Sequence, residues 1–219
     1  GGGGAESGRV MGMTGETRKR TGAKRTQAST SRGVAIRPSV PARTNNIPGL
    51  DLAVLAHGCP ALTRAAGATL CEAAAVCLDD GHTPAALLSV RGAVEMEDEL
   101  DWPIATDQAK RTYSDPDVAT ELGACGVAIL VLRDQTGLTV VERSRKGTGF
   151  DYWIGPDDGL FQKKARMEVS GVRSGNAKTI ERRVGRKKTQ TERSDHLGID
   201  AYVVVVEFSA PQVAYEVRT

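Results

Sequence analysis

Two short stretches in the second half of the chain each place one acidic residue among apolar ones, in a pattern typical of strands. Side chains alternate between the faces of a strand. Asp151 therefore shares a face with Trp153, opposite the other apolar residues of 150–154, and Glu168 lies opposite the apolar residues of 165–170. If the apolar faces of the two strands pair on the same side, both carboxylates emerge together on the other. Two carboxylates so close repel, which raises the pKa of one of them unless a cation lies between them. The pattern therefore predicts a site for an oxygen-seeking divalent ion, Mg²⁺ or Mn²⁺.

A helix is predicted just before these strands, and it brings a third acid toward them. Residues 114–117, Ser-Asp-Pro-Asp, are a typical helix start, with Ser114 as the expected cap. Apolar residues then recur at helical spacing until Gly137. Glu121 lies about 60° from the centre of this apolar stripe, at 100° per residue. It borders the buried face and can act as a third metal ligand or as a hydrogen-bonding neighbour of the ligands.

The remaining pattern of the second half predicts an α/β fold. Strands are expected over 138–145, 150–154 and 165–170, with a glycine-rich turn at 147–149. A strongly basic helix over 179–193 follows, and then the apolar run of 201–208, which is typical of a strand in the middle of a covered sheet. The predicted order is thus helix, three-strand meander, helix, strand.

This order of elements resembles the core of the PD-(D/E)xK phosphodiesterases, the restriction-endonuclease-like fold. The resemblance covers residues 114–208 and rests on the order together with Glu121 on the first helix, Asp151 on the second strand and Glu168 on the third. It implies that Asp151 and Glu168 bind Mg²⁺ or Mn²⁺ with the help of Glu121. It also implies hydrolysis of a phosphodiester of nucleic acid, with DNA as the expected partner, in which the metal activates the attacking water.

The sequence departs from the family at the lysine that ends the third-strand motif, where it has Ser170. A serine hydroxyl forms hydrogen bonds but carries no charge. Lys164 and Lys178 are the expected catalytic substitutes, and Lys178 shares a helical face with Arg182; Lys146 is a further candidate. The alternative is a catalytically degenerate fold that binds nucleic acid, or acts as a scaffold, without cutting.

Each of the three acids also has a purely structural interpretation, which the sequence leaves open. Asp151 can cap a turn or pair with a neighbouring arginine. Glu168 can pair with Arg166 or with a lysine of the basic helix, and Glu121 can be an ordinary exposed carboxylate.

The basic helix is the predicted contact for the phosphates of nucleic acid. Its positive charges follow the acidic strand directly, which suits a polyanionic backbone. The residues expected to contact nucleic acid are Arg182, Arg183, Arg186, Lys187 and Lys188.

Charge and composition divide the 219 residues into three parts. Residues 1–48 have a net charge of +7 and almost no large apolar side chains, which predicts a disordered basic arm. Residues 49–112 are expected to form a small helical and extended subdomain, with helices between Leu50 and Cys77 and an acidic edge or loop over 95–101. Residues 113–219 are expected to form the nuclease-like core.

Several classes of protein are excluded or disfavoured by the same composition. No apolar run is long enough to span a membrane, and the first residues lack the pattern of a secretory signal. The four cysteines include no closely spaced pair, so reduced thiols packed in the core are expected rather than a zinc site or disulfides. A cytoplasmic protein fits best, and the oligomeric state, a homodimer included, is not fixed by the sequence.

Overall fold

The structure is a computed structural model that describes residues 49–219, so the arm predicted for residues 1–48 lies outside the described residues. The strands and helices are, in chain order, β1 (Leu50–Asp51), η1 (Leu52–His57), α1 (Arg64–Leu78), β2 (Ala86–Gly92), β3 (Met96–Asp101), α2 (Asp107–Thr112), α3 (Pro116–Thr136), β4 (Thr139–Arg143), β5 (Tyr152–Gly155), β6 (Ala165–Val172), α4 (Ala177–Thr191), η2 (Glu192–Leu197), β7 (Ala201–Glu207) and β8 (Gln212–Arg218).

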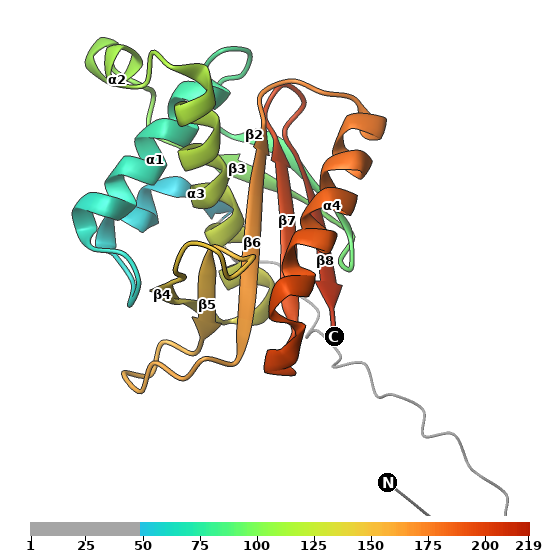
Figure 1. The fold of residues 1–219 in the computed structure, drawn as a ribbon. Coiled ribbons are helices and arrows are strands. Elements are labelled where there is room, and N and C mark those ends of the chain that lie inside the picture. Colours follow the sequence, from blue (N-terminus) through green and yellow to red (C-terminus); the bar gives the residue numbers. More distant parts are fainter. Residues whose placement is uncertain (1–48) are drawn as a thin grey trace, which may run out of the picture. The chain divides into compact units, whose positions relative to one another are not determined.

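The strands form one mixed sheet of eight strands in the order β1-β3-β2-β8-β7-β6-β5-β4 (Figure 1). β4, β5 and β6 form an antiparallel meander, β7 pairs with β6 in parallel, and β8 returns antiparallel to β7. The predicted α/β class is confirmed, and so is the order helix, three strands, helix, strand from α3 to β7. β8 was not predicted.

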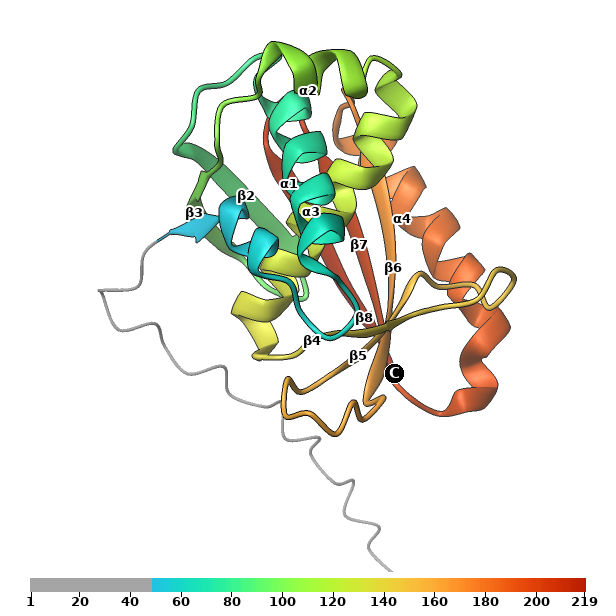
Figure 2. The same cartoon turned by 90° about the vertical axis from the view of Figure 1, so that its left-hand side faces the viewer.

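Helices cover both faces of the sheet (Figures 1 and 2). α1 and α3 pack against each other on one face, where most of the apolar core lies, and α4 lies on the other. The two packed helices approach closely at Gly123, where an added Cβ would lie 2.9 Å from the Cα of Ala74. A larger residue at this position would push α1 and α3 apart.

Residues 49–112, expected to form a subdomain of their own, instead share the sheet and the core with the rest of the described chain. β1, β2 and β3 extend the sheet beyond β8, and α1 packs on α3. The acidic stretch predicted as an edge or loop is strand β3, whose Glu97 and Glu99 are exposed while Leu100 is fully buried. Burial of Leu100 and of Val90 on β2 joins this part to the main core.

Two local features differ from the sequence predictions. β5 begins at Tyr152, so Asp151 precedes the strand expected over 150–154. α3 is capped by Asp115, whose carboxylate accepts hydrogen bonds from two backbone amides of the first turn, and not by Ser114. The cysteines are free thiols as expected, three of them buried and Cys59 half-buried. None of the helices in residues 49–219 is long and apolar enough to cross a membrane.

Candidate active site

Asp151 lies just before β5, beside the part of the β6 edge that β5 does not pair with. β5 pairs with β6 only from Ala165 to Met167, and no other strand of residues 49–219 covers the rest of this edge. The backbone amide of Asp151 donates to the carbonyl of Met167 at 2.8 Å. Its carboxylate accepts a hydrogen bond from the backbone amide of Val169, also at 2.8 Å. The side chain of Asp151 thus takes the place of a strand neighbour and is held at the exposed edge of the sheet.

This edge of β6 is one wall of a cavity of about 500 Å³. α3 lines this cavity from one face of the sheet and α4 from the other. Arg143, at the end of β4, lines it as well. The lining residues are Asp117, Thr120, Glu121, Cys125, Arg143, Asp151, Val169, Ser170, Gly171, Arg183 and Lys187.

Glu168 lies beside this cavity on the face of β6 that α4 covers, and it is only 1% exposed. One carboxylate oxygen, Oε1, accepts hydrogen bonds from the ammonium of Lys187 and, at 2.8 Å, from the amide of Gln190. The other, Oε2, is buried and has no hydrogen-bond partner among the described residues. An acid buried in this way keeps unused capacity to bind a hydrogen-bond donor or a cation.

The two carboxylates are close enough to influence each other, as the sequence predicted. The pKa of Glu168 is raised from its ordinary value of 4.5 to about 7. Burial is the largest cause of this shift, and the negative charge of Asp151 is the second. Lys187 acts in the opposite direction but does not outweigh these effects. Near neutral pH, Glu168 is therefore divided between its protonated and its ionised form.

α4 makes polar contacts with β6 on the face of the sheet that it covers. Alternate residues of β6 face it: Ser170 accepts a hydrogen bond from Arg183 at 3.3 Å, and Glu168 pairs with Lys187 one helical turn later. The apolar contacts of α4 are few, with Ile180 packing against Val172 and Val205. These alternating contacts fix which face of the helix meets the carboxylates.

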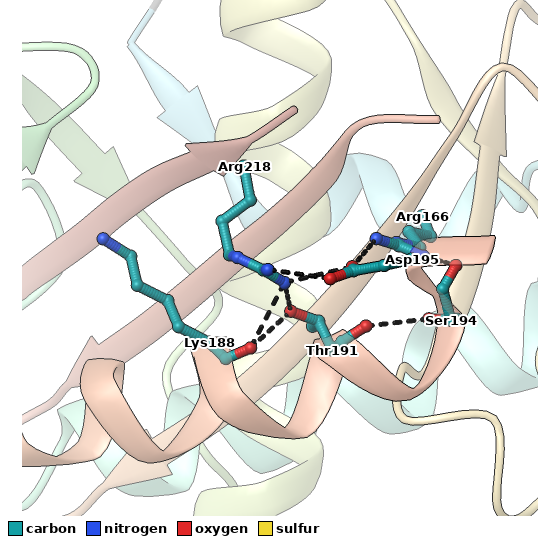
Figure 3. A network of polar contacts seen from close by, with 6 residues as sticks. All are labelled: Arg166, Lys188, Thr191, Ser194, Asp195 and Arg218. Carbon is teal, nitrogen blue, oxygen red and sulfur yellow. Dashed lines mark hydrogen bonds and ion pairs between the residues drawn. The ribbon is translucent and has the colours of Figure 1, made fainter. Parts of the chain in front are cut away.

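The C-terminal end of α4 is fastened by the network in Figure 3, which joins three parts of the chain. The buried guanidinium of Arg166 on β6 donates to the carbonyl of Ser194 and, at 2.6 Å, to the carboxylate of Asp195. Arg218 on β8 donates to Asp195 at 3.0 Å and to Thr191 at 2.7 Å. The hydrogen bond from Arg218, with that from Arg166, holds the pKa of Asp195 below its usual range.

We expect Asp195→Ala to lower the melting temperature of the protein clearly. The substitution leaves the guanidinium of Arg166, which is only 3% exposed, without its carboxylate partner, and an unpaired buried charge is strongly destabilising. Arg91→Ala is the matched control, because it removes exposed ion pairs with Glu95 and Glu97, which contribute little. Thermal unfolding followed by circular dichroism checks this, and equal melting temperatures for the two variants would contradict it.

The turn between β4 and β5 is fastened to α4 by a close contact at Gly149. Its φ is +88°, and an added Cβ would clash with the backbone carbonyl of Gln190. The contact fixes the turn that carries Arg143 and Asp151 against the helix that carries Lys187. The predicted turn at 147–149 therefore also helps to position the site.

The structure brings some of the predicted site residues together and leaves others apart. Asp151 and Glu168 meet at the edge of β6, and Glu121 lines the same cavity from α3. Within residues 49–219, however, no three His, Cys, Asp or Glu side chains form a preformed metal-binding group. The expected lysines Lys164 and Lys178 are exposed and line neither this cavity nor the second one on α4.

The basic helix divides into residues that face the cavities and residues that do not. Arg183 and Lys187 line the cavity beside Asp151 and also a second one of about 640 Å³ on α4, to which Arg186 and Arg193 contribute. Lys188 pairs with Glu216 of β8 at 2.8 Å. Arg182 is exposed and lines neither cavity.

Three residues take positions in the site that the sequence did not assign to them. Lys187, predicted to bind nucleic acid, contacts Glu168, so the pairing of Glu168 with a lysine of the basic helix, one of its structural interpretations, is observed; Gln190 contacts Glu168 as well. Arg143 lines the cavity, and its guanidinium lies 5.5 Å from the centre of the Tyr152 ring. The spacing of Lys187 and Gln190 on one helical face was the signal available in the sequence.

Comparisons with known proteins identified no relative of this chain. The chain matches no protein-family model, and searches of curated proteins and of solved structures found no similar protein.

Proposed function

We propose that this protein is a metal-dependent nuclease with a PD-(D/E)xK-like site on a restriction-endonuclease-like core, with DNA as the expected substrate. The observation that carries the proposal is the meeting of Asp151 and Glu168 at the free edge of β6, with Lys187 in contact with Glu168. In this assignment, Lys187 on α4 replaces the lysine that the family motif has at the position of Ser170.

The carboxylate pair has the properties that a divalent-cation site needs. Glu168 has a buried oxygen without a partner among the described residues, and Asp151 adds a second negative charge beside it. Mg²⁺ is usually held by one or two carboxylates, with water and substrate phosphates completing its coordination. Asp151 and Glu168 would therefore suffice as protein ligands, and Glu121, which lines the same cavity, would assist them.

The other residues of the cavity suit the chemistry of phosphodiester hydrolysis. When bound, Mg²⁺ or Mn²⁺ polarises the phosphoryl oxygen and lowers the pKa of the attacking water. The ammonium of Lys187 neutralises negative charge that develops at the phosphate. Arg143 and Arg183 approach the cavity from opposite sides and can each bind a phosphate oxygen. No aromatic side chain lines the cavity, so its recognition is directed to the phosphates.

The direct test is incubation of the full chain with supercoiled plasmid and with labelled DNA and RNA strands, in Mg²⁺, in Mn²⁺ and in EDTA. Cleavage that requires the divalent ion supports the proposal, and the preferred strand identifies the substrate. Salt-sensitive binding without cleavage in either metal contradicts it and favours the alternative, a nucleic-acid-binding module whose chemistry is lost. Neither binding nor cleavage would contradict both.

A further inference from the structure

Lys187 forms an ion pair with Glu168, the acid that the proposed function assigns to the cation together with Asp151. Its ammonium and the amide of Gln190 both donate to Oε1, and the Glu168 side chain is 1% exposed. The ion pair therefore shields a carboxylate that has almost no contact with water. Oε2 has no partner among the described residues, so Lys187 and Gln190 satisfy only half of the group.

The net charge of the group formed by Asp151, Glu168 and Lys187 would change when a divalent cation binds. Asp151 and Glu168, when both are ionised, carry two negative charges, of which Lys187 neutralises one. A divalent cation neutralises both without the lysine. With the ammonium still in place the site would have an excess positive charge, and the two cations would repel each other across a short distance in a poorly hydrated pocket.

Lys187 also has room to leave Glu168. Its side chain is 21% exposed, and it lines the cavity of about 500 Å³ beside Asp151 as well as the larger one on α4. The lysine stem is flexible, with the ammonium at its end. Arg143 and Arg183 line the first of these cavities, so an ammonium that turns into it joins the groups that face a substrate phosphate.

From these contacts we propose that Lys187 is a built-in counter-ion that competes with the divalent cation for Glu168, so that cation binding releases the lysine toward the phosphate. The inference rests on the proposed function, because it assumes that Asp151 and Glu168 hold the cation. It adds an order of events: the lysine becomes available to the substrate only in the cation-loaded protein.

The test measures binding of Mn²⁺ alone, without nucleic acid, by titration calorimetry and by the electron paramagnetic resonance signal of free Mn²⁺. Lys187→Met, which keeps most of the unbranched side chain and removes its charge, is expected to bind Mn²⁺ about tenfold more tightly than the unaltered protein. Lys187→Arg, which retains the charge, should not gain affinity. Lys188→Met is the matched control, because the neighbouring lysine pairs with Glu216 instead, and its affinity for Mn²⁺ should be unchanged.

A second measurement follows the lysine itself and does not depend on how well Lys187→Met folds. In the unaltered protein, the nuclear magnetic resonance signal of the Lys187 side chain should shift on addition of Mg²⁺, while that of Lys188 stays constant. Equal or weaker Mn²⁺ binding by a folded Lys187→Met, or an unmoved Lys187 signal at saturating Mg²⁺, overturns the competition and leaves the proposed function standing. Absence of divalent-cation binding in every variant overturns both.

Discussion

Asp151→Asn is expected to reduce cleavage of nucleic acid in Mg²⁺ by more than about 100-fold, because changes to mere neighbours of metal ligands already cost 10- to 100-fold. The fold should survive the change. An asparagine has the shape of aspartate, and its carbonyl oxygen can still accept the hydrogen bond from the amide of Val169. The variant therefore removes the negative charge from the edge of β6 but keeps the hydrogen bond between the side chain of residue 151 and the amide of Val169.

The measurement is the initial rate of strand cleavage together with a thermal unfolding curve for each variant. Asp107→Asn is the control, since Asp107 is an exposed residue in the first turn of α2 and does not line the cavity. Cleavage by Asp151→Asn within a few fold of the unaltered protein would remove Asp151 from the metal site. Equal loss in both variants would show that the loss is not specific to the cavity.

Glu168→Gln is expected to remove a pH dependence of stability that the unaltered protein shows in the absence of metal. The carboxyl group has an ordinary pKa of 4.5 and a pKa of about 7 in the folded protein. Between these values the folded protein binds more protons than the unfolded chain, so the free energy of unfolding falls as pH rises. Once the pH exceeds both pKa values, the free energy of unfolding has fallen by about 3 kcal/mol in total, since one pKa unit corresponds to 1.36 kcal/mol.

Urea unfolding in EDTA at pH 5 and at pH 8 measures this difference. Between the two pH values, the free energy of unfolding should fall by roughly 2 to 3 kcal/mol more in the unaltered protein than in Glu168→Gln. Glu216→Gln, which removes a partly exposed acid that pairs with Lys188 on the outside of α4, should behave as the unaltered protein does. The same pH dependence in Glu168→Gln would show that Glu168 is not the group that titrates.

The strands that carry the acids could be predicted because their apolar residues alternate. Period-2 alternation fixes which side chains share a face, and Glu168 lies opposite Met167 and Val169 as parity predicts. Asp151 precedes β5, and its carboxylate lies at the edge of β6, where it accepts a hydrogen bond from the amide of Val169. The helical spacing in α3 and α4 is equally clear. The order of the elements from α3 to β7 followed from these local patterns alone.

The sequence left the partner of Glu168 open between Arg166 and a lysine of the basic helix, and it did not identify Lys187. α4 carries several basic residues, and its sequence alone does not select the one that contacts Glu168. That choice depends on tertiary contacts, namely Ile180 against Val172 and Val205 at one end and the network around Asp195 at the other. Lys178 and Lys164 were expected from sequence proximity, but their side chains are exposed and line neither cavity.

The acidic strand β3 could not be predicted from local pattern either. β3 has the sequence MEDELD, in which only Met96 and Leu100 are apolar, and it becomes a strand because β2 and β1 pair with it. Asp101 and its acidic neighbours suggested a solvated segment. Pairing between segments distant in sequence outweighs such weak propensity.

The two faces of β6 have different roles: one packs into the main core, and the other carries residues proposed for the reaction. Ala165, Met167 and Val169 point into the main core, while Arg166, Glu168 and Ser170 contact α4 and η2. The residues that would define the reaction can therefore be exchanged with little repacking of the layer beneath α1 and α3. Such an arrangement allows one scaffold to gain, lose or change an activity in few mutational steps, and it makes this strand a natural place to redesign the site.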